Sequence, residues 1–175
     1  MLESESNFLR TRSQIIDERG SFSKLFGQSS TGEITFDSHL TQVNYVKNYS
    51  ARTLRGLHYQ VDEFSETKIV HCIKGSVWDV IVDLRKNSPT YREWIGHKLS
   101  ASNMNFMTVP QGFAHGYITL EDDSELLYFS DKEFSIKHER GIIWDDPNID
   151  IKWPVEPVII SHKDQNWPTL LDAPE

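Results

Sequence analysis

The chain has 175 residues, of which 38% are hydrophobic and 25% are charged. This is the composition of a folded globular protein, and it excludes a disordered chain, a collagen and a coiled coil. Acidic residues outnumber basic ones by 26 to 18, and the formal net charge of −8 argues against a nucleic-acid-binding surface.

The sequence predicts a single cytoplasmic domain, residues 1–175, that is not attached to a membrane. No apolar run approaches the roughly 18 residues needed to span a bilayer, and the N-terminus lacks the apolar core of a signal peptide. Cys72 is the only cysteine, so it cannot form an internal disulfide, which is typical of proteins from a reducing compartment.

Short runs of β-branched and aromatic residues alternate along the chain with turn residues. Their spacing predicts an all-β antiparallel sandwich or barrel with little helix. Most of the seven prolines lie beyond residue 140 together with three tryptophans, so the last part is predicted to wrap the barrel as irregular chain. The predicted strands are Lys68–Ile73, Ser76–Leu84, Trp94–Leu99, Asn105–Val109, His115–Leu120 and Ser124–Ser130.

The pair Lys74-Gly75 is predicted to form the two-residue loop of a β-hairpin. In that register Lys68 lies opposite position 81, and Asp83 is its diagonal neighbour on the same face. The face is either a solvated surface with an ion pair or the mouth of a small barrel. In the second case a lysine held by Asp83 could stabilise developing negative charge.

Two of the seven histidines, His58 and His115, have glycines close by in the sequence, where the backbone can approach a ligand. The spacing Pro110-x-Gly112-x-x-His115 resembles half of the cupin metal-binding signature. The other half, with its second histidine and glutamate, is missing, so the sequence predicts no metal site. A metal-dependent cupin enzyme remains a weaker alternative.

Motifs spread over nearly the whole chain, from Asp17-Glu18-Arg19-Gly20 to Trp167-Pro168, resemble the dTDP-4-dehydrorhamnose 3,5-epimerase family. They occur in the order in which the family has them. The motifs are Arg55-Gly56-Leu57-His58-Tyr59-Gln60, Val82-Asp83-Leu84-Arg85 with Ser88-Pro89-Thr90, Pro110-Gln111-Gly112-Phe113-Ala114-His115-Gly116, Trp144-Asp145-Asp146-Pro147, Ile151-Lys152-Trp153-Pro154 and Ser161-His162-Lys163-Asp164.

The resemblance implies a metal-free, cupin-type jelly-roll barrel without a cofactor. Such enzymes are usually homodimers and invert carbons beside the keto group of a nucleotide-diphospho-4-keto-6-deoxy sugar. The matching positions make His58 the base that removes the proton alpha to the C4 ketone, with Asp164 orienting its ring. Lys68 would stabilise the enolate, with Asp83 as its partner.

The resemblance also implies a set of substrate-binding residues. Arg19 and Arg55 match positions that bind the diphosphate, for which a guanidinium is suited. Gln42, Asn44 and His115 match the neighbourhood of the sugar or nucleotide. The early segment Glu33–Val46 is expected to form a strand that pairs across the dimer interface, because unpaired edges invite partners.

Two residues depart from the family pattern. Phe134 stands where the resemblance places the tyrosine that acts as catalytic acid, and a phenylalanine cannot donate a proton. We therefore expect slow or single-centre inversion, unless water or a hydroxyl such as Tyr128 or Tyr45 takes over. Lys24 stands where relatives commonly have glutamate near the base, which leaves the nucleotide base open. The alternative function is a catalytically reduced sugar-nucleotide-binding barrel.

Overall fold

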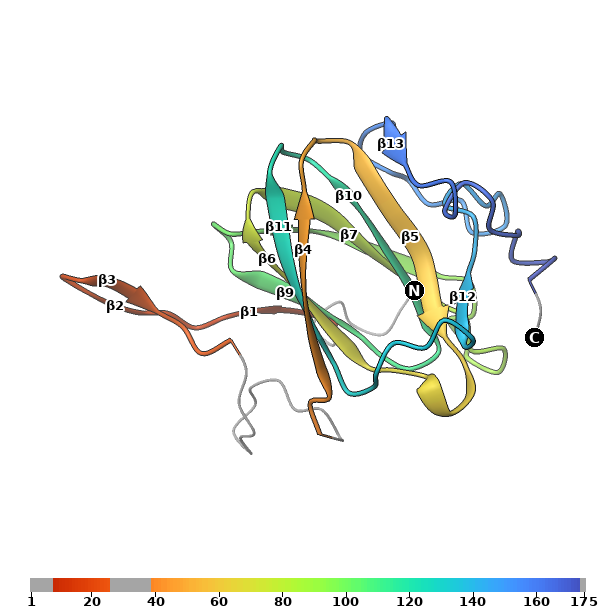
Figure 1. Cartoon of the computed structure of the whole chain (residues 1–175), viewed down its shortest axis with the longest axis horizontal. Coiled ribbons are helices and arrows are strands. Elements are labelled where there is room, and N and C mark those ends of the chain that lie inside the picture. The colour runs from red at the N-terminus through yellow and green to blue at the C-terminus, as the bar shows by residue number, and fades with distance from the viewer. Residues whose placement is uncertain (1–7, 26–38, 174–175) are drawn as a thin grey trace.

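Two β-sheets face each other in the computed structural model, which describes residues 8–25 and 39–173 (Figure 1). The strands within each sheet pair antiparallel, apart from one short parallel pairing of β13 with β5. In order across the first sheet, the strands are β1 (Leu9–Thr11), β9 (Asn105–Val109), β6 (Lys68–Lys74), β11 (Ser124–Ser130) and β4 (Gln42–Asn48). Those of the second are β12 (Glu139–Gly141), β5 (Thr53–Gln60), β10 (Phe113–Thr119), β7 (Ser76–Asp83) and β8 (Trp94–Ser100), with β13 (Ile159–Ile160) on β5.

The all-β jelly-roll prediction is confirmed, and each of the six predicted strands is present within one or two residues of its expected bounds. The helical content of the described residues is limited to one 3₁₀ turn, η2 (Asp62–Phe64), and none of these residues belongs to a helix able to cross a membrane. The expected strand Glu33–Val46 lies outside the described residues up to position 38, and its remaining part overlaps β4, which continues to Asn48.

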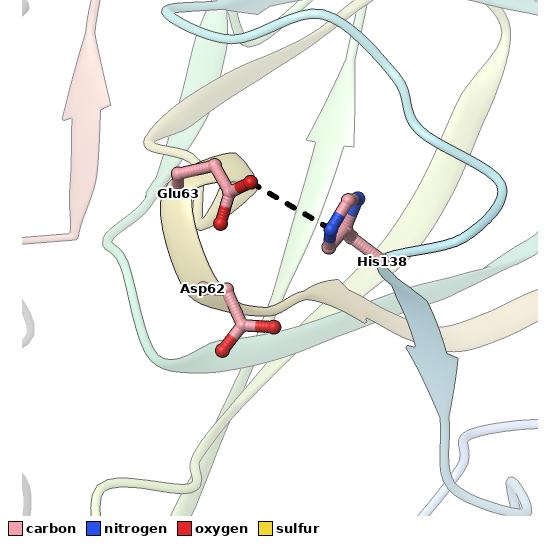
Figure 2. Close-up of side chains that lie close together, drawn as sticks. All are labelled: Asp62, Glu63 and His138. Atoms are coloured by element: carbon pink, nitrogen blue, oxygen red, sulfur yellow. Dashed lines mark ion pairs between the residues drawn. The ribbon is translucent and has the colours of Figure 1, made fainter.

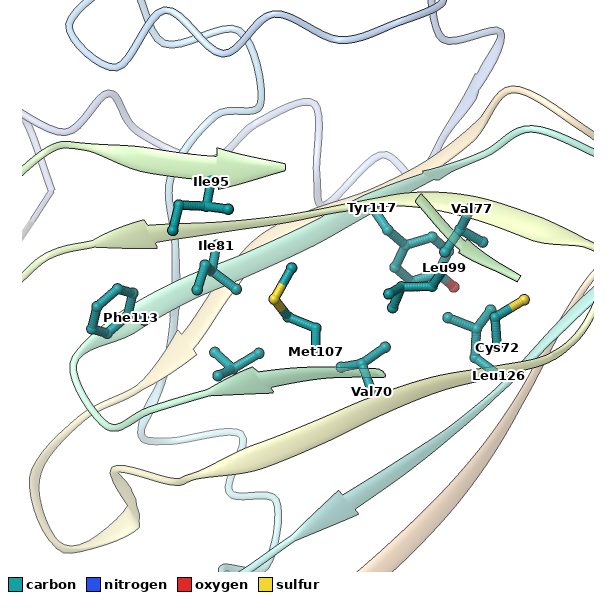
Figure 3. Packing of buried hydrophobic residues seen from close by; sticks show 11 residues of the cluster. Val70, Cys72, Val77, Ile81, Ile95, Leu99, Met107, Phe113, Tyr117 and Leu126 are labelled. Atoms are coloured by element: carbon teal, nitrogen blue, oxygen red, sulfur yellow. The ribbon is translucent and has the colours of Figure 1, made fainter. Parts of the chain in front are cut away.

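An apolar core lies between the sheets (Figure 3). Side chains of β6, β9 and β11 pack there against those of β7, β8 and β10. The exclusion of this apolar surface from water is the main term that holds the sheets together. Its buried members are Val70, Cys72, Val77, Ile81, Ile95, Leu99, Met107, Val109, Phe113, Tyr117 and Leu126.

The C-terminal part of the chain wraps the outer face of the second sheet, as the sequence predicts. Beyond β12 the described chain is irregular apart from β13, and it lies beside β5 (blue in Figure 1). Ile142 and Ile149 of this segment are buried against Val80 and Val82 of β7. Strand β7 is therefore covered on both faces, which explains its nearly continuous run of apolar residues.

The predicted hairpin at Lys74-Gly75 is wrong. Strand β6 pairs with β9 and β11, whereas β7 pairs with β8 and β10, so the connection carries the chain from one sheet to the other. Gly75 makes this crossing with a φ of 70°, and a Cβ there would lie 2.5 Å from the hydroxyl of Ser124. Lys68 consequently faces Val109 and Ser130 across the strands, and not position 81.

Asp83 is fully buried at the end of β7, and it stabilises the loop that leads to β8 through hydrogen bonds. Its carboxylate accepts hydrogen bonds from Arg85 Nη2 at 2.7 Å and from the hydroxyls of Ser88 and Thr90, each at 2.6 Å. Burial acts to raise the pKa of Asp83, but these hydrogen bonds outweigh burial and hold the pKa well below its usual range. The predicted pairing of Asp83 with Lys68 is therefore replaced by a structural role.

We expect the substitution Asp83→Asn to lower the free energy of unfolding at pH 7 by about 2–3 kcal/mol, because donors of three residues, Arg85, Ser88 and Thr90, lose a charged acceptor. The depressed pKa means that this contribution is present above about pH 4 and is lost as the pH falls through the folded-state pKa. The difference between wild type and variant in denaturant unfolding should therefore narrow in acid.

Asp150→Asn is a matched control, because Asp150 is exposed and paired only with the exposed Lys152. It should change the unfolding free energy by less than about 0.5 kcal/mol. Equal stability of Asp83→Asn and wild type at pH 7 would contradict the structural role of Asp83.

Candidate active site

Two adjoining cavities of about 370 and 560 Å³ lie between the sheets and form one cleft. They share the side chains of His58 from the second sheet, Lys68 and Tyr128 from the first, and Lys163 from the C-terminal wrap. Gln42, Asn44 and Phe134 line the first cavity, and Arg55, His115 and Asp164 line the second. The cleft therefore collects most of the site residues that the sequence analysis named.

A β-bulge in β5 brings two of these residues to the same face. Strand β10 pairs His115 with His58 and Tyr117 with Arg55. One residue of β10, Gly116, therefore lies opposite two residues of β5, Gly56 and Leu57. The extra residue reverses the usual alternation, and both Arg55 and His58 face the cleft. Gly56 makes the bulge possible, since its φ is 135° and a Cβ would lie 2.5 Å from the Cα of Gly116.

His58 and Asp164 form a close pair in the cleft. His58 Nε2 lies 2.7 Å from Asp164 Oδ1, and the aspartate, only 3% exposed, also accepts the N–H of Gly56. Burial acts to raise the pKa of Asp164, but the hydrogen bond and charge of His58 outweigh burial and lower the pKa. A carboxylate on Nε2 leaves Nδ1 as the nitrogen that can take up a proton.

A second histidine–aspartate pair lies on the floor of the cleft, beside His58. His115 Nε2 is 2.8 Å from Asp79 Oδ2, and Asp79 is fully buried. Burial raises the pKa of Asp79, although the charge and hydrogen bond of His115 and the charge of Lys68 act against burial. Nothing in the sequence linked Asp79 to His115, which lies 36 positions further along the chain.

Tyr128 reaches the cleft from the sheet opposite His58. Its ring stands edge-on to that of His115, with 6.1 Å between centroids, and its hydroxyl is hydrogen-bonded with Tyr117. The pKa of Tyr128 is raised well above its usual value, mainly because the side chain is buried. The hydroxyl therefore stays protonated. Tyr45 lies on the outer face of β4, 57% exposed and hydrogen-bonded with Glu125, so it does not face the cleft.

Phe134, Gln42 and Asn44 form the polar and aromatic rim of the first cavity. Gln42 Nε2 donates to Asn44 Oδ1 at 2.9 Å, and the backbone N–H of Phe134 donates to Gln42 Oε1 at 2.9 Å. The ring of Phe134 is 55% exposed. The rim is thus an exposed aromatic face beside fixed amide groups.

Arg19 is the one predicted binding residue that lies outside the cleft of its own chain. It follows β2 (Ile15–Asp17) in a hairpin with β3 (Gly20–Phe22) that projects away from the two sheets (Figure 1). Its guanidinium is 83% exposed and pairs with Asp17 at 2.6 Å. Lys24 is on the same N-terminal arm and lines neither cavity.

Three further charged residues line the cleft and were missed by the sequence analysis. Glu66 forms an ion pair with Lys68, and Glu139 forms one with Lys163 at 2.7 Å. Glu66 precedes β6 in a connection with no periodic pattern, so no sequence signal predicted its direction. Lys163 belongs to the recognised motif around Asp164, which could have indicated it.

Among the described residues, one group of three side chains could hold a metal ion: Asp62, Glu63 and His138 (Figure 2). None of the three is a predicted site residue. Asp62 and Glu63 of η2 face His138, whose Nε2 is 3.9 Å from Glu63 Oε1. Both acids are exposed, and the His138 ring is stacked on Phe64. The group provides a surface ion pair and does not include His58 or His115.

Comparisons with known proteins agree with this geometry. Residues 4–172 match the family model described as dTDP-4-dehydrorhamnose 3,5-epimerase. The chain is 42% identical over 158 residues to dTDP-4-dehydrorhamnose 3,5-epimerase from Shigella flexneri, covering 90% of this chain and 87% of the relative. The structure matches that of dTDP-4-dehydrorhamnose 3,5-epimerase from Bacillus anthracis with TDP and PPi bound, with a TM-score of 0.89, 35% identity and coverage of 96% and 97% of the two chains.

A third relative is ChmJ, a 3'-monoepimerase from Streptomyces bikiniensis. A structure of its double mutant in complex with dTDP has a TM-score of 0.84 and 28% identity, with 93% of this chain and 82% of that chain covered. The mutant replaces one histidine and one tyrosine. Their separation in that sequence equals the separation between His58 and Tyr128 here.

Proposed function

The chain belongs to the dTDP-4-dehydrorhamnose 3,5-epimerase family and is an epimerase of a dTDP-linked 4-keto-6-deoxy sugar, and from this premise we propose that its cleft inverts carbon centres by proton transfer between facing sheets. His58 would act from the second sheet and Tyr128 from the first. The observation that carries the proposal is that His58, Tyr128 and Lys68 each line both cavities.

In this mechanism, His58 Nδ1 removes the proton alpha to the C4 ketone. The C–H electron pair forms the enolate double bond, and negative charge collects on the ketone oxygen. The Lys68 ammonium stabilises that oxygen in a partly enclosed cleft, where charge is poorly screened. Tyr128 then gives its hydroxyl proton to the opposite face of the carbon, and the phenolate recovers a proton from solvent while His58 releases one.

Tyr128 replaces Phe134 as the site of the acid in this proposal. We expected single-centre inversion because Phe134 has no hydroxyl. The protonated hydroxyl of Tyr128 on the facing sheet can supply the proton instead, so the proposal no longer limits inversion to one centre. Phe134 instead offers an exposed flat ring at the rim, which suits stacking of the nucleotide base. The Arg55 guanidinium, fixed by Nε to Asn48 Oδ1 at 2.9 Å, faces the second cavity and suits the diphosphate.

The same proposal treats residues 1–175 as one cytoplasmic epimerase domain that works without metal or cofactor. An ammonium at Lys68 supplies the positive charge for which another enzyme would use a Lewis acid. Chelator-sensitive activity would favour the metal-dependent cupin alternative. Absence of solvent-proton exchange into the sugar would favour the binding-barrel alternative.

We further propose that the active form is a homodimer. Arg19 has a binding role by resemblance but lies on a projecting hairpin, so it can reach only the cleft of a second copy. Ile15, Ile16 and Phe22 of this hairpin are each at least 65% exposed, and apolar side chains exposed together mark an interaction surface. Among the strands that the structure describes, β4 is also at the edge of the first sheet, and strand edges invite pairing.

We expect His58→Asn to abolish both deuterium exchange and inversion, because the base is lost, with a decrease of about 10²-fold or more. Tyr128→Phe should keep exchange and lose inversion, because the enolate still forms but lacks its acid. Both are measured by NMR in D₂O with dTDP-4-keto-6-deoxyglucose. Tyr49→Phe, at an exposed tyrosine outside both cavities, is the control. Full inversion by Tyr128→Phe would show that another group is the acid.

For Phe134→Ala we expect a rise in KM of about 10-fold, since base–aromatic stacking contributes roughly 1–3 kcal/mol, with kcat nearly unchanged. Phe134→Tyr should behave as wild type, because stacking needs only the ring. Steady-state kinetics on both variants tests this assignment. If Phe134→Tyr instead converts a single inversion into a double one, position 134 takes part in proton transfer.

We expect light scattering to give the mass of a dimer at micromolar concentration. Inactive His58→Asn and weakened Arg19→Ala should regain activity when mixed and allowed to exchange subunits. One mixed site then combines His58 from one copy with Arg19 from the other. A monomer, or a mixture no more active than its parts, would count against the shared site.

A further inference from the structure

The ammonium of Lys68 is held by a carboxylate that the family motifs quoted above do not contain. Glu66 Oε1 lies 2.9 Å from Lys68 Nζ, and the two side chains are only 14% and 13% exposed. Both line the first cavity. The pair is therefore largely removed from water, where its attraction is much less screened than on a surface.

A second anchor fixes the other oxygen of Glu66. The hydroxyl of Ser130 donates to Glu66 Oε2, and Ser130 is also the residue that pairs with Lys68 between β11 and β6. Lys68, Glu66 and Ser130 are thus linked in a closed set of three interactions: a strand pairing, a hydrogen bond and an ion pair. Such a set restricts a lysine side chain whose rotamer freedom is otherwise large.

Several other charged or titratable groups lie in or beside the same cleft, and those with close charged partners are already paired. Asp79 is near enough for the charge of Lys68 to act on its pKa, but its carboxylate is hydrogen-bonded to His115. Lys163 is paired with Glu139, and His58 is paired with Asp164. The remaining groups of this kind along the two cavities are Arg55 and Tyr59 on β5, Tyr117 on β10 and Tyr128 on β11.

We propose that Glu66 is a positioning residue for the epimerase reaction, holding the Lys68 ammonium oriented toward the developing enolate oxygen. This inference rests on the proposed role of Lys68. Glu66 uses one of the three donors of the ammonium, so two remain for the substrate. Because it acts through Lys68 and touches no reacting atom, its loss should lower kcat more than it raises KM.

The test is a double-mutant cycle between Glu66→Gln and Lys68→Met. Glutamine keeps the size of the side chain and can still accept from Ser130, but removes the counter-charge. We expect Lys68→Met to lower kcat about 10²-fold or more. Glu66→Gln should lower kcat about 10- to 100-fold with KM within about threefold of wild type, as expected for a misplaced group. The double variant should be no slower than Lys68→Met alone.

The split between kcat and KM separates positioning from a merely structural role, because a general disturbance of the cleft would not leave KM near its wild-type value. Glu63→Gln is the matched control. It removes an equally charged but exposed side chain from the same segment and should leave kcat unchanged.

Ser130→Ala provides a second variant if Glu66→Gln folds poorly. It removes one anchor of Glu66 and should lower kcat in the same direction by a smaller factor. Wild-type kcat in Glu66→Gln, or in Ser130→Ala where the first variant cannot be purified, would overturn the inference. So would losses that multiply in the double variant. Full activity of Lys68→Met would instead overturn the proposed role of Lys68, and the two failures are thus distinguishable.

Discussion

The extra residue in β5 is the constraint on which the cleft depends. Regular alternation would turn Arg55 and His58 to opposite faces of the sheet, and the bulge at Gly56 turns both inward. The backbone N–H of Gly56 also donates to Asp164, so the same irregularity anchors the C-terminal wrap beside His58. One glycine therefore brings together a cation, an imidazole and its carboxylate from two segments of the chain, β5 and the C-terminal wrap.

Local sequence pattern predicted the strands but not the sheets to which they belong. Alternation and turn residues are local properties, and they located β6 to β11 almost without error. The turn residues of Lys74-Gly75 look alike whether the chain returns within a sheet or crosses to the facing one. That choice depends on β8 and β9, which lie further along the chain. The pairing of Lys68 with Asp83 failed for this reason.

The candidate site divides in the same way between strands and loops. The sequence named Tyr128 only as a possible substitute acid beside Tyr45. The structure separates the two, because Leu126 and Ser130, two positions away from Tyr128 on either side, are buried, whereas Tyr45 is exposed. The approach of Asp164 to His58 was available only from the order of the motifs, since 106 positions separate the two residues. Glu66 and Phe134 lie in connections without a period, so only the folded structure shows where their side chains lie.

His58 and Tyr128 come from different sheets, and no local stretch of backbone sets the gap between them. The thickness of the apolar layer, with Met107 and Ile81 at its centre, determines how far apart the two walls stand. In the proposed mechanism, the face of the carbon that receives the proton therefore depends on the volume of the core side chains. A change of one methylene deep in the barrel could alter the ratio of epimer to returned substrate while every polar group of the cleft stays intact.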